Sequence, residues 1–546
     1  MRAAILFLIM INGLYELEAQ TDRFTSSPLK IGTNYRIYPG NVSQTEAFIT
    51  KSPVDENTFF VTCNTIMFIP FFISEGIYVT SNAGTTWYGS DTCKGDPIGY
   101  HGGDPGITID KNGTFILTRL GRTPFVGLYS HFSTDQGRTW SSQQVISTDD
   151  LERAALMSDA VAASFNYGQT YAAWVTFAQP FPVMFAFTDN GAQKWSVPKQ
   201  INQPPNRCAG GDIAIGPNGE VYLCWAGVTD FSPFKEILVG FASSSDGGAN
   251  WNVNENAFSI NGISGVLASK NNIRVNSLPG IAVDTTHGPR RGWIYIVTDQ
   301  KNSLPAGTDP DVILYRSTDG GSTWSTGIRV NQDPLNNGKT QFFPSVHVDK
   351  SGAVDIIFYD DRNTTIDSSG VFFSRSLDGG NTWSEFEISD HHFMPSPIGG
   401  LGQGYQGDNI DLSSNHSKIL PVWMDNSSGI YQLWTVPVEF SDINHLEETN
   451  SKQGGAGIKQ AFPNPTKSLS EIRYQITVQG SVSLKVFNLT GKEMATLVNA
   501  QQRAGHYSVK FDASNLPPGI YFYRLRAGNF VSVWKLVKLE ESGLSD

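Results

Sequence analysis

The sequence predicts an all-β protein in which one short β-unit is repeated along the chain, followed by a smaller β-domain at the C-terminus. The first observation is a phrase of eight residues, ending in Trp, that recurs six times. Its tryptophans are spaced by 53, 55, 56, 73 and 59 residues. The second observation is the composition, with 54 Gly, 12% aromatic and only 16% charged residues, which is typical of many short strands joined by tight turns. Repetition at this period indicates an array of one supersecondary unit.

The four most complete copies of the phrase share Ser, Asp, Gly and Trp. They are Ser133–Trp140, Ser244–Trp251, Ser317–Trp324 and Ser376–Trp383, and the weaker copies are Thr80–Trp87 and Thr188–Trp195. The Asp can accept hydrogen bonds from backbone N–H groups of its own turn, and the Gly supplies a positive φ angle at low cost. The Trp offers a large apolar ring for burial. We therefore expect each copy to form a rigid hairpin loop with a structural role.

The wording and spacing of this phrase resemble the Asp-box (BNR) repeats of the sialidase-like β-propellers. The resemblance implies a β-propeller, and short strand-like runs before each box repeat in the same order. Together with a unit at 407–439 that lacks the box, seven blades are expected. Residues 29–38 would add the strand that the last unit lacks and so close the ring, which removes exposed sheet edges. A ring of six blades, as in sialidases, is the alternative.

The N-terminus predicts a signal peptide over residues 1–19. Arg2 precedes the apolar run Ala3–Ile11, and Leu17-Glu18-Ala19 is a plausible cleavage site. The apolar run is too short to span a bilayer, and no other segment is a transmembrane candidate. The propeller is expected over 29–440, and a polar, Gly-containing linker over 441–460.

Residues 461–541 resemble the C-terminal sorting domain of the type IX secretion system. The matching pieces are Phe462-Pro463-Asn464-Pro465, the segment Val486–Lys492 (VFNLTGK) and the segment Leu516–Leu525 (LPPGIYFYRL). The resemblance implies export across the outer membrane of a Bacteroidetes-type bacterium, with release or surface attachment, and the type IX machinery as a partner. Composition alone predicts a small β-sandwich.

Net charge and cysteine usage limit the partners and the compartment. A net charge of −12 argues against nucleic acid and anionic membrane surfaces. In an oxidising compartment the four cysteines could form two bridges. Cys208 and Cys224 flank a predicted hairpin turn and could pair, leaving Cys63 with Cys93; buried free thiols are the alternative.

The candidate site follows from propeller geometry, in which the innermost strand of each blade lines a central channel and begins at one face. The Asp boxes lie on the other face. Acidic residues precede five of the predicted innermost strands, namely Glu46, Asp104, Asp159, Asp212 and Asp408. The ends of second strands add Arg119, Asp360 and Arg362. Crowded carboxylates repel one another, which raises the pKa of some of them into the range that a general acid needs.

We assign catalytic roles to Asp104, Asp360 and Arg362, and substrate contacts to Glu46, Arg119, Asp159, Arg207, Asp212 and Asp408. Arg119, Arg207 and Arg362 would hold a substrate carboxylate, because the planar guanidinium binds it in two places. Sialidases also carry an Arg-Ile-Pro motif, which is interrupted here as Arg36-Ile37-Tyr38-Pro39, and a Tyr/Glu nucleophilic pair, for which Tyr405 and Glu46 are the candidates. No cofactor and no metal ligand set is expected, although the acidic mouth could hold a structural calcium ion.

These features predict a secreted or surface-attached protein that acts on extracellular glycans, as a sialidase-like glycoside hydrolase if it is catalytic. The alternatives are a non-catalytic propeller that binds glycans or proteins, and a polysaccharide lyase in which Arg neutralises a uronate and Tyr or His removes the proton. Three arginines around one carboxylate beside a Tyr–Glu contact would favour a sialidase. A mouth of acids alone would favour binding or another chemistry.

Overall fold

The computed structural model describes residues 29–95, 98–440, 457–458, 461, 464, 466–476, 479–488, 492–527 and 530–539. The predicted signal peptide, and nearly all of the predicted linker, lie outside these residues. The chain divides into two compact units with the boundary between Glu439 and Phe440. The described residues contain strands, the 3-10 turns η1 (Ile98–Tyr100) and η2 (Ala268–Lys270), and no α-helix, so the all-β prediction is confirmed.

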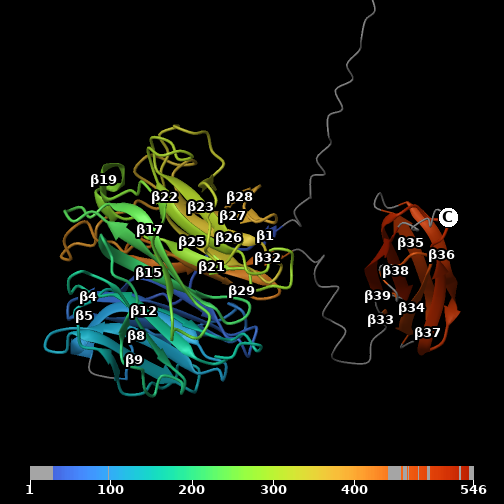
Figure 1. The fold of residues 1–546 in the computed structure, drawn as a ribbon, viewed down its shortest axis with the longest axis horizontal. Coiled ribbons are helices and arrows are strands. Elements are labelled where there is room, and N and C mark those ends of the chain that lie inside the picture. The colour runs from blue at the N-terminus through green and yellow to red at the C-terminus, as the bar shows by residue number, and fades with distance from the viewer. Residues whose placement is uncertain are drawn as a thin grey trace, which may run out of the picture. The chain divides into compact units, whose positions relative to one another are not determined.

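The first unit contains seven large antiparallel sheets, six of them with four strands in which each strand pairs with the next along the chain (Figure 1). The first sheet contains β3 (Ser43–Lys51), β4 (Phe59–Phe68), β5 (Phe71–Thr80) and β6 (Tyr88–Ser90). The second contains β7 (His101–Ile109), β8 (Phe115–Gly121), β9 (Gly127–Ser133) and β10 (Gln144–Ser147). The third contains β11 (Ala155–Ser158), β12 (Thr170–Val175), β13 (Val183–Thr188) and β14 (Lys199–Gln200).

The next three sheets repeat this order after Trp195. The fourth sheet contains β15 (Arg207–Ile215), β16 (Val221–Val228), β17 (Glu236–Ser244) and β18 (Asn252–Ser259). The fifth contains β21 (Gly280–Val283), β22 (Ile294–Gln300), β23 (Asp311–Ser317) and β24 (Ile328–Arg329). The sixth contains β25 (Gln341–Val348), β26 (Val354–Asp360), β27 (Gly370–Ser376) and β28 (Ser384–Glu387). Between the fourth and fifth sheets the chain inserts the hairpin β19 (Gly265–Leu267) and β20 (Ile273–Val275).

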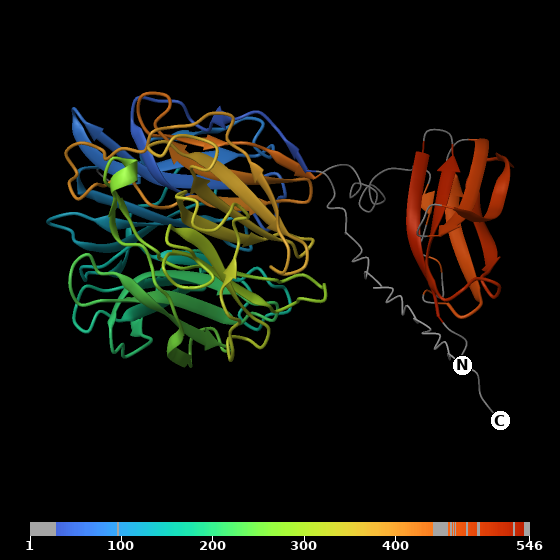
Figure 2. The same ribbon diagram turned by 90° about the horizontal axis from the view of Figure 1, so that it is seen from above.

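The seventh sheet joins the two ends of the unit. It contains β29 (Asp411–Ser414), β30 (Lys418–Asp425), β31 (Gln432–Thr435) and β32 (Val438–Phe440), together with β1 (Leu29–Ile31) and β2 (Tyr35–Arg36) from the N-terminus. Tyr35 pairs with Thr435 and Arg36 with Trp434, so residues 29–38 do add strands to the last sheet. Figure 2 shows the blue N-terminal strands beside the orange last ones.

The recurring phrase forms the same hydrogen-bonded turn after the third strand of a sheet. In the copy after β23, Ser317 donates to Asp319 Oδ1 (2.8 Å), which also accepts from the backbone N–H of Thr323 (2.9 Å). The same set of contacts recurs in the copies that begin at Ser133, Ser244 and Ser376. The Trp ring packs on the preceding sheet, as Trp324 does against Phe241 at 5.2 Å between ring centroids. The phrase therefore stabilises the turn and the contact between neighbouring sheets.

The expected disulfide between Cys208 and Cys224 is not formed, and Cys63, Cys208 and Cys224 are buried free thiols. Cys208 pairs with Gly227 across β15 and β16, three residues beyond Cys224. That offset is about 10 Å along a strand, whereas a bridge needs Cα atoms within about 7 Å. The two thiols also belong to different core clusters.

The second unit has two antiparallel sheets that share one core. One sheet orders β33 (Gly457–Ile458), β34 (Leu469–Ile476) and β37 (Gly505–Asp512); the other orders β36 (Glu493–Gln502), β35 (Gly480–Asn488), β38 (Gly519–Ala527) and β39 (Phe530–Lys538). Alternate residues of β34 and β35 are buried, among them Ile472, Tyr474, Val482 and Leu484. This period of two is the pattern of strands with one face on a core.

Candidate functional site

A central cavity of about 530 Å³ is lined by the first strand of each of the seven sheets. The contributing strands are β3, β7, β11, β15, β21, β25 and β29. Small residues let these strands approach one another: a Cβ at Gly106 of β7 would lie 2.2 Å from the carbonyl oxygen of Ala154. We call the end of the cavity at which these strands begin the mouth. The repeated Ser/Asp turns follow third strands and lie at the opposite end.

A backbone bulge turns side chains into the mouth in several first strands. The pairing register shifts between Thr45 and Phe48 in β3, and between Gly103 and Gly106 in β7. Within these bulges Glu46 has φ 61° and Asp104 has φ 52°. Non-glycine residues adopt this left-handed region at a cost of about 1–3 kcal/mol, and such strain concentrates at functional sites. The two acids are therefore held in strained positions at the mouth.

Asn64 connects Asp104 to Tyr405. Its side-chain Nδ2 lies 3.1 Å from Asp104 Oδ1 and 3.0 Å from the hydroxyl of Tyr405, while its Oδ1 accepts from the backbone N–H of Asp104 at 2.6 Å. The Tyr405 hydroxyl also lies 3.2 Å from Thr45 Oγ1 and hydrogen-bonds Glu46. One amide thus orients the carboxyl of Asp104 and the phenol of Tyr405 together.

Arg274 and Asp408 complete the mouth cluster, which we define as Glu46, Asp104, Arg274, Tyr405 and Asp408. Arg274 Nη2 lies 3.4 Å from Asp408 Oδ2, and its guanidinium lies 5.3 Å from the centre of the Tyr405 ring. Asp408 also accepts hydrogen bonds from Asn276 (2.6 Å) and Asn409 (2.9 Å). Asp408 is therefore held in place by one guanidinium and two side-chain amides.

The carboxyls of the mouth differ in their electrostatic surroundings. Burial raises the pKa of Glu46 well above its usual value, and the negative charges of Asp408 and Asp104 raise it further. Burial also raises the pKa of Asp104, with a further contribution from Asp408, against lowering by Asn64 and by Arg153 and Arg274. Burial, Glu46 and Asp104 raise the pKa of Tyr405, which stays protonated. The pKa values of Glu46 and Asp104 are thus raised, and both carboxyls stand beside Asp408, which pairs with Arg274 and two amides.

The structure brings Glu46, Asp104 and Asp408 of the predicted set together. Asp212 lines the cavity, where it accepts from the backbone N–H groups of Ile213 (2.9 Å) and Ile281 (3.0 Å). Burial raises the pKa of Asp212. Since its oxygens are bound to two neighbouring inner strands, Asp212 has a structural role between sheets.

The predicted position of Asp159 was wrong. Strand β11 ends at Ser158, so Asp159 follows the innermost strand and lies at the end opposite the mouth. Asp159 is fully buried and accepts from Val161 N (2.9 Å) and Ser164 Oγ (2.5 Å) within a tight turn. At the mouth end the same sheet offers Glu152 and Arg153, which precede β11 and which the sequence analysis did not select.

Arg119 does not face the mouth either. Its side chain is fully buried inside the second sheet. It donates to His131 Nε2 (3.0 Å) and Gln143 Oε1 (2.8 Å) and lies over the Tyr129 ring. A guanidinium with these partners and no exposed surface cannot take a substrate carboxylate.

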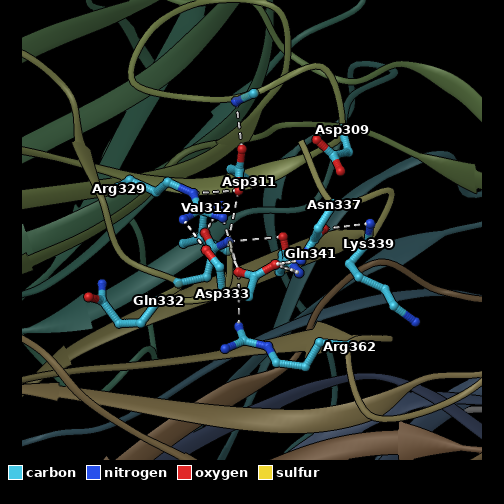
Figure 3. Close-up of polar contacts among 12 residues, drawn as sticks. Asp309, Asp311, Val312, Arg329, Gln332, Asp333, Asn337, Lys339, Gln341 and Arg362 are labelled. Atoms are coloured by element: carbon cyan, nitrogen blue, oxygen red, sulfur yellow. Dashed lines mark hydrogen bonds and ion pairs between the residues drawn. The ribbon is translucent and has the colours of Figure 1, made fainter. Parts of the chain in front are cut away.

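Asp360 and Arg362 belong to a separate polar network away from the cavity lining. Arg362 pairs with Asp360 Oδ2 at 2.5 Å and also with Glu385. It reaches Asp333 as well, at 3.5 Å, as Figure 3 shows. Arg329 binds Asp311 (2.6 Å) and Asp333 (3.0 Å) from the preceding sheet. Burial raises the pKa of Asp360 to about 6, against lowering by Arg362. Because these ion pairs connect two neighbouring sheets, we assign the charged residues of this network a structural role.

Arg207 lies at the start of β15 among the rings of Phe177, Phe181 and Phe234, at 5.7, 4.7 and 4.5 Å. Its charge lowers the pKa of Glu152, which burial raises. Of the three arginines predicted to hold a carboxylate, Arg119 is fully buried and Arg362 is paired with acids, whereas Arg207 is partly exposed and stacks on aromatic rings.

Sequence reasoning missed Arg274 and underrated Tyr405. Arg274 lies on the inserted hairpin β19–β20, and the signal for that insertion was the 73-residue spacing between Trp251 and Trp324. Tyr405 lies in a Gly-rich loop that contacts the hairpin, where Arg274 N donates to Gly404 O at 2.7 Å. Only the folded chain shows this contact, because the two segments are about 130 residues apart.

Among the described residues, no group of three or more His, Cys, Asp or Glu has an arrangement that could hold a metal ion. No helix in the described ranges is long and apolar enough to cross a membrane.

Comparison with known proteins identifies the C-terminal unit. The family described as secretion system C-terminal sorting domain matches residues 460–539, which confirms the type IX sorting domain. This domain implies interaction with the secretion machinery, export, and a secreted or outer-surface location. No curated protein matches the chain.

Several solved structures resemble the chain at low sequence identity. One is a protein of unknown function from Dyadobacter fermentans, with 12% identity and TM-score 0.42, covering 76% of this chain and 99% of that one. A second is a polysaccharide lyase of family PL25, an ulvan lyase, with 10% identity and TM-score 0.45, covering 76% and 96%. A third is a leech intramolecular trans-sialidase, with 9% identity and TM-score 0.40, covering 65% and 70%.

Proposed function

We propose that the chain is a secreted, seven-bladed, sialidase-like Asp-box propeller that hydrolyses glycosidic bonds of extracellular glycans at the mouth cluster. The observation that carries this proposal is that two carboxyls lie at the mouth beside Arg274 and Tyr405: Asp104, whose pKa is raised by burial, and Asp408, which pairs with Arg274 and Asn276. Glycoside hydrolysis uses two carboxyls, one of which is a general acid with a raised pKa.

In this proposal Asp104 is the general acid that protonates the leaving glycosidic oxygen. Its raised pKa keeps the proton available, and its side chain is partly exposed, unlike that of Glu46. Asp408 is the second carboxyl, which attacks the sugar or activates water, and Asn276 and Arg274 hold it in place. Tyr405 and Asn64 are positioning residues for Asp104. The sorting domain delivers this site outside the cell, where glycans are the abundant polymers.

The test is incubation of the full secreted chain with a glycan panel that includes sialosides and uronate polymers, following new reducing ends. We expect Asp104→Asn and Asp408→Asn each to lower turnover by about 100-fold or more. Activity of the unmodified chain should fall on the alkaline side as Asp104 loses its proton, and Asp104→Asn should remove that limb.

The matched control is Asp246→Asn, which changes an acid in a repeated turn at the opposite end of the sheets. It should leave turnover unchanged. Unsaturated products, detected by ultraviolet absorbance, would show that the chain is a lyase and not a hydrolase. Binding to a glycan array without any product would show that the chain is a non-catalytic, glycan-binding propeller.

A further inference from the structure

A second repeated sequence lies on the mouth side of the first unit. Pro-Phe occurs in the loop between the second and third strands of each of the first four sheets, at Pro70-Phe71, Pro124-Phe125, Pro180-Phe181 and Pro233-Phe234. Second strands end, and third strands begin, at the same end of the sheet as the mouth. Phe71 is 50% exposed and Phe125 44% exposed. Core packing therefore does not account for the exposed rings of this repeat.

The first aromatic patch, on the first two sheets, consists of Phe68, Phe71, Tyr100, Arg122 and Phe125. The Arg122 guanidinium lies 5.0 Å from the centre of the Phe71 ring, and Tyr100 meets Phe125 edge to face at 4.9 Å. Phe68 packs near Gly400, in the loop that leads to Tyr405. The patch is thus continuous with the mouth cluster.

The second aromatic patch, on the third and fourth sheets, consists of Phe177, Phe181, Arg207, Phe231 and Phe234. Three of its rings surround Arg207, and Phe231 is 72% exposed in the same loop as Phe234. Glu152 lies between this patch and the cavity, since its Oε2 accepts from the backbone N–H of Gly210 at 2.6 Å, and Gly210 lines the cavity three residues after Arg207 in β15. Both patches therefore share one composition, exposed Phe rings beside a stacked arginine, and both lie next to the mouth.

We propose that the two patches are subsites for one long polysaccharide chain that carries carboxylate or sulfate groups and crosses the mouth. Apolar faces of sugar rings pack on aromatic rings, and exposed aromatic patches of this kind mark ligand-binding surfaces. Stacking holds each guanidinium flat, and its free edge offers the paired donors that a carboxylate or sulfate accepts. The proposal rests on the proposed function and specifies its substrate class and its action within long chains.

Charge complementarity identifies this occupant. The chain is acidic overall, at −12, yet Arg122, Arg153, Arg207 and Arg274 lie around the mouth. A neutral glycan would use the rings and leave the guanidinium groups of Arg122 and Arg207 unused. A polyanion would use both.

The experiment compares polygalacturonate, dextran sulfate and neutral dextran with the full chain, by affinity electrophoresis and by turnover on long and trimeric substrates. Arg207→Gln, Arg122→Gln and Phe231→Ala should each weaken retention by the anionic polymer and raise KM for the long chain by about tenfold. KM for the trimer should change less than twofold. Arg207→Lys should behave like Arg207→Gln, because the ammonium does not stack.

The matched control is Leu377→Ala, an exposed apolar side chain at the opposite end of the sheets, which should bind like the unmodified chain. The carboxylate and sulfate polymers distinguish the two anion types. Equal retention on neutral dextran, no retention on either polyanion, or patch variants that bind like the control would overturn the inference. Loss of turnover in Asp104→Asn with retention intact would separate the two proposals, since retention tests the patches alone.

Discussion

At the scale of single residues, the mouth is made by backbone strain and shared partners. Glu46 and Asp104 occupy bulge positions with positive φ, and the matching bulge of the fourth sheet holds Gly210. Glycine adopts a positive φ angle without strain. Glu46 and Asp104 at the two corresponding positions therefore cost conformational energy that a glycine would not. The strand order of the repeats predicted acids at this edge, and Glu46, Asp104 and Asp408 are among them. It could not predict that Asn64 and Tyr405 orient Asp104, because those contacts cross sheets.

Asp299 provides a test of the buried acids. It is fully buried, accepts from Phe343 N at 3.0 Å, and burial raises its pKa to about 7. A carboxyl with a raised folded-state pKa supports stability at low pH, and this support is lost as pH rises through about 7. Asp299→Asn cannot ionise, so its Tm should exceed that of the unmodified chain at pH 8 but not at pH 5.

The measurement is thermal unfolding of both proteins at pH 5 and pH 8. Each unit of pKa shift corresponds to about 1.4 kcal/mol, so the pH effect on Asp299 amounts to a few kcal/mol. Equal pH dependence in the two proteins would show that Asp299 does not titrate in this range.

At the scale of elements, the repeated turn does more than its sequence predicts. The predicted contacts of Ser and Asp are present. In addition, a Phe side chain of the preceding sheet packs directly against the second Gly of the turn. A Cβ at Gly321 would lie 2.1 Å from Phe241, and one at Gly248 would lie 2.3 Å from Phe185. The turn therefore fixes the distance between neighbouring sheets, which the sequence could not reveal because the partner is one repeat away.

Two adjacent glycines of the repeated turn separate the effect of backbone strain from the effect of packing against the preceding sheet. Gly320 and Gly321 both have positive φ, 73° and 89°, but a Cβ at Gly320 would meet nothing within 4 Å. We expect Gly320→Ala to cost about 1 kcal/mol of unfolding free energy, from backbone strain alone. Gly321→Ala should cost about 1–3 kcal/mol more, because the methyl group overpacks against Phe241. Denaturant unfolding of the two variants measures the difference, and equal costs would contradict the packing role.

At the scale of the whole molecule, the first unit closes through its ends. Strand β2 pairs with β31, Gly32 N donates to Pro437 O at 2.9 Å, and the Tyr35 hydroxyl donates to Gly84 O. The closing strand was predictable because the last repeat was one strand short. The position of the charged network at Asp360 and Arg362 was not, because a dense polar run looks the same in sequence whether it lines a cavity or joins two sheets.

Removal of the closing strands tests this arrangement. A chain that begins after residue 38 should unfold several degrees lower than one that begins at Leu29, because the outer edge of β31 loses its partner. The measurement is thermal unfolding with size-exclusion chromatography, and the exposed edge should also increase self-association. A chain that begins at Leu29 is the control and should match the full-length chain, whereas identical melting of both truncations would show that closure does not depend on these strands.

The sequence by itself determined the repeat period, the strand order within each repeat, the hairpin turns and the sorting domain, because these depend on residues close together in the chain. Tertiary structure alone decided which polar residues meet. It moved Asp159 to the opposite end of its strand, enclosed Arg119, and placed Arg362 in a contact between sheets. It also brought Arg274 and Tyr405 to Glu46, Asp104 and Asp408. The physical reason is that the mouth cluster takes its side chains from separate sheets, the inserted hairpin and the loop before β29, and only closure of the ring brings these segments together.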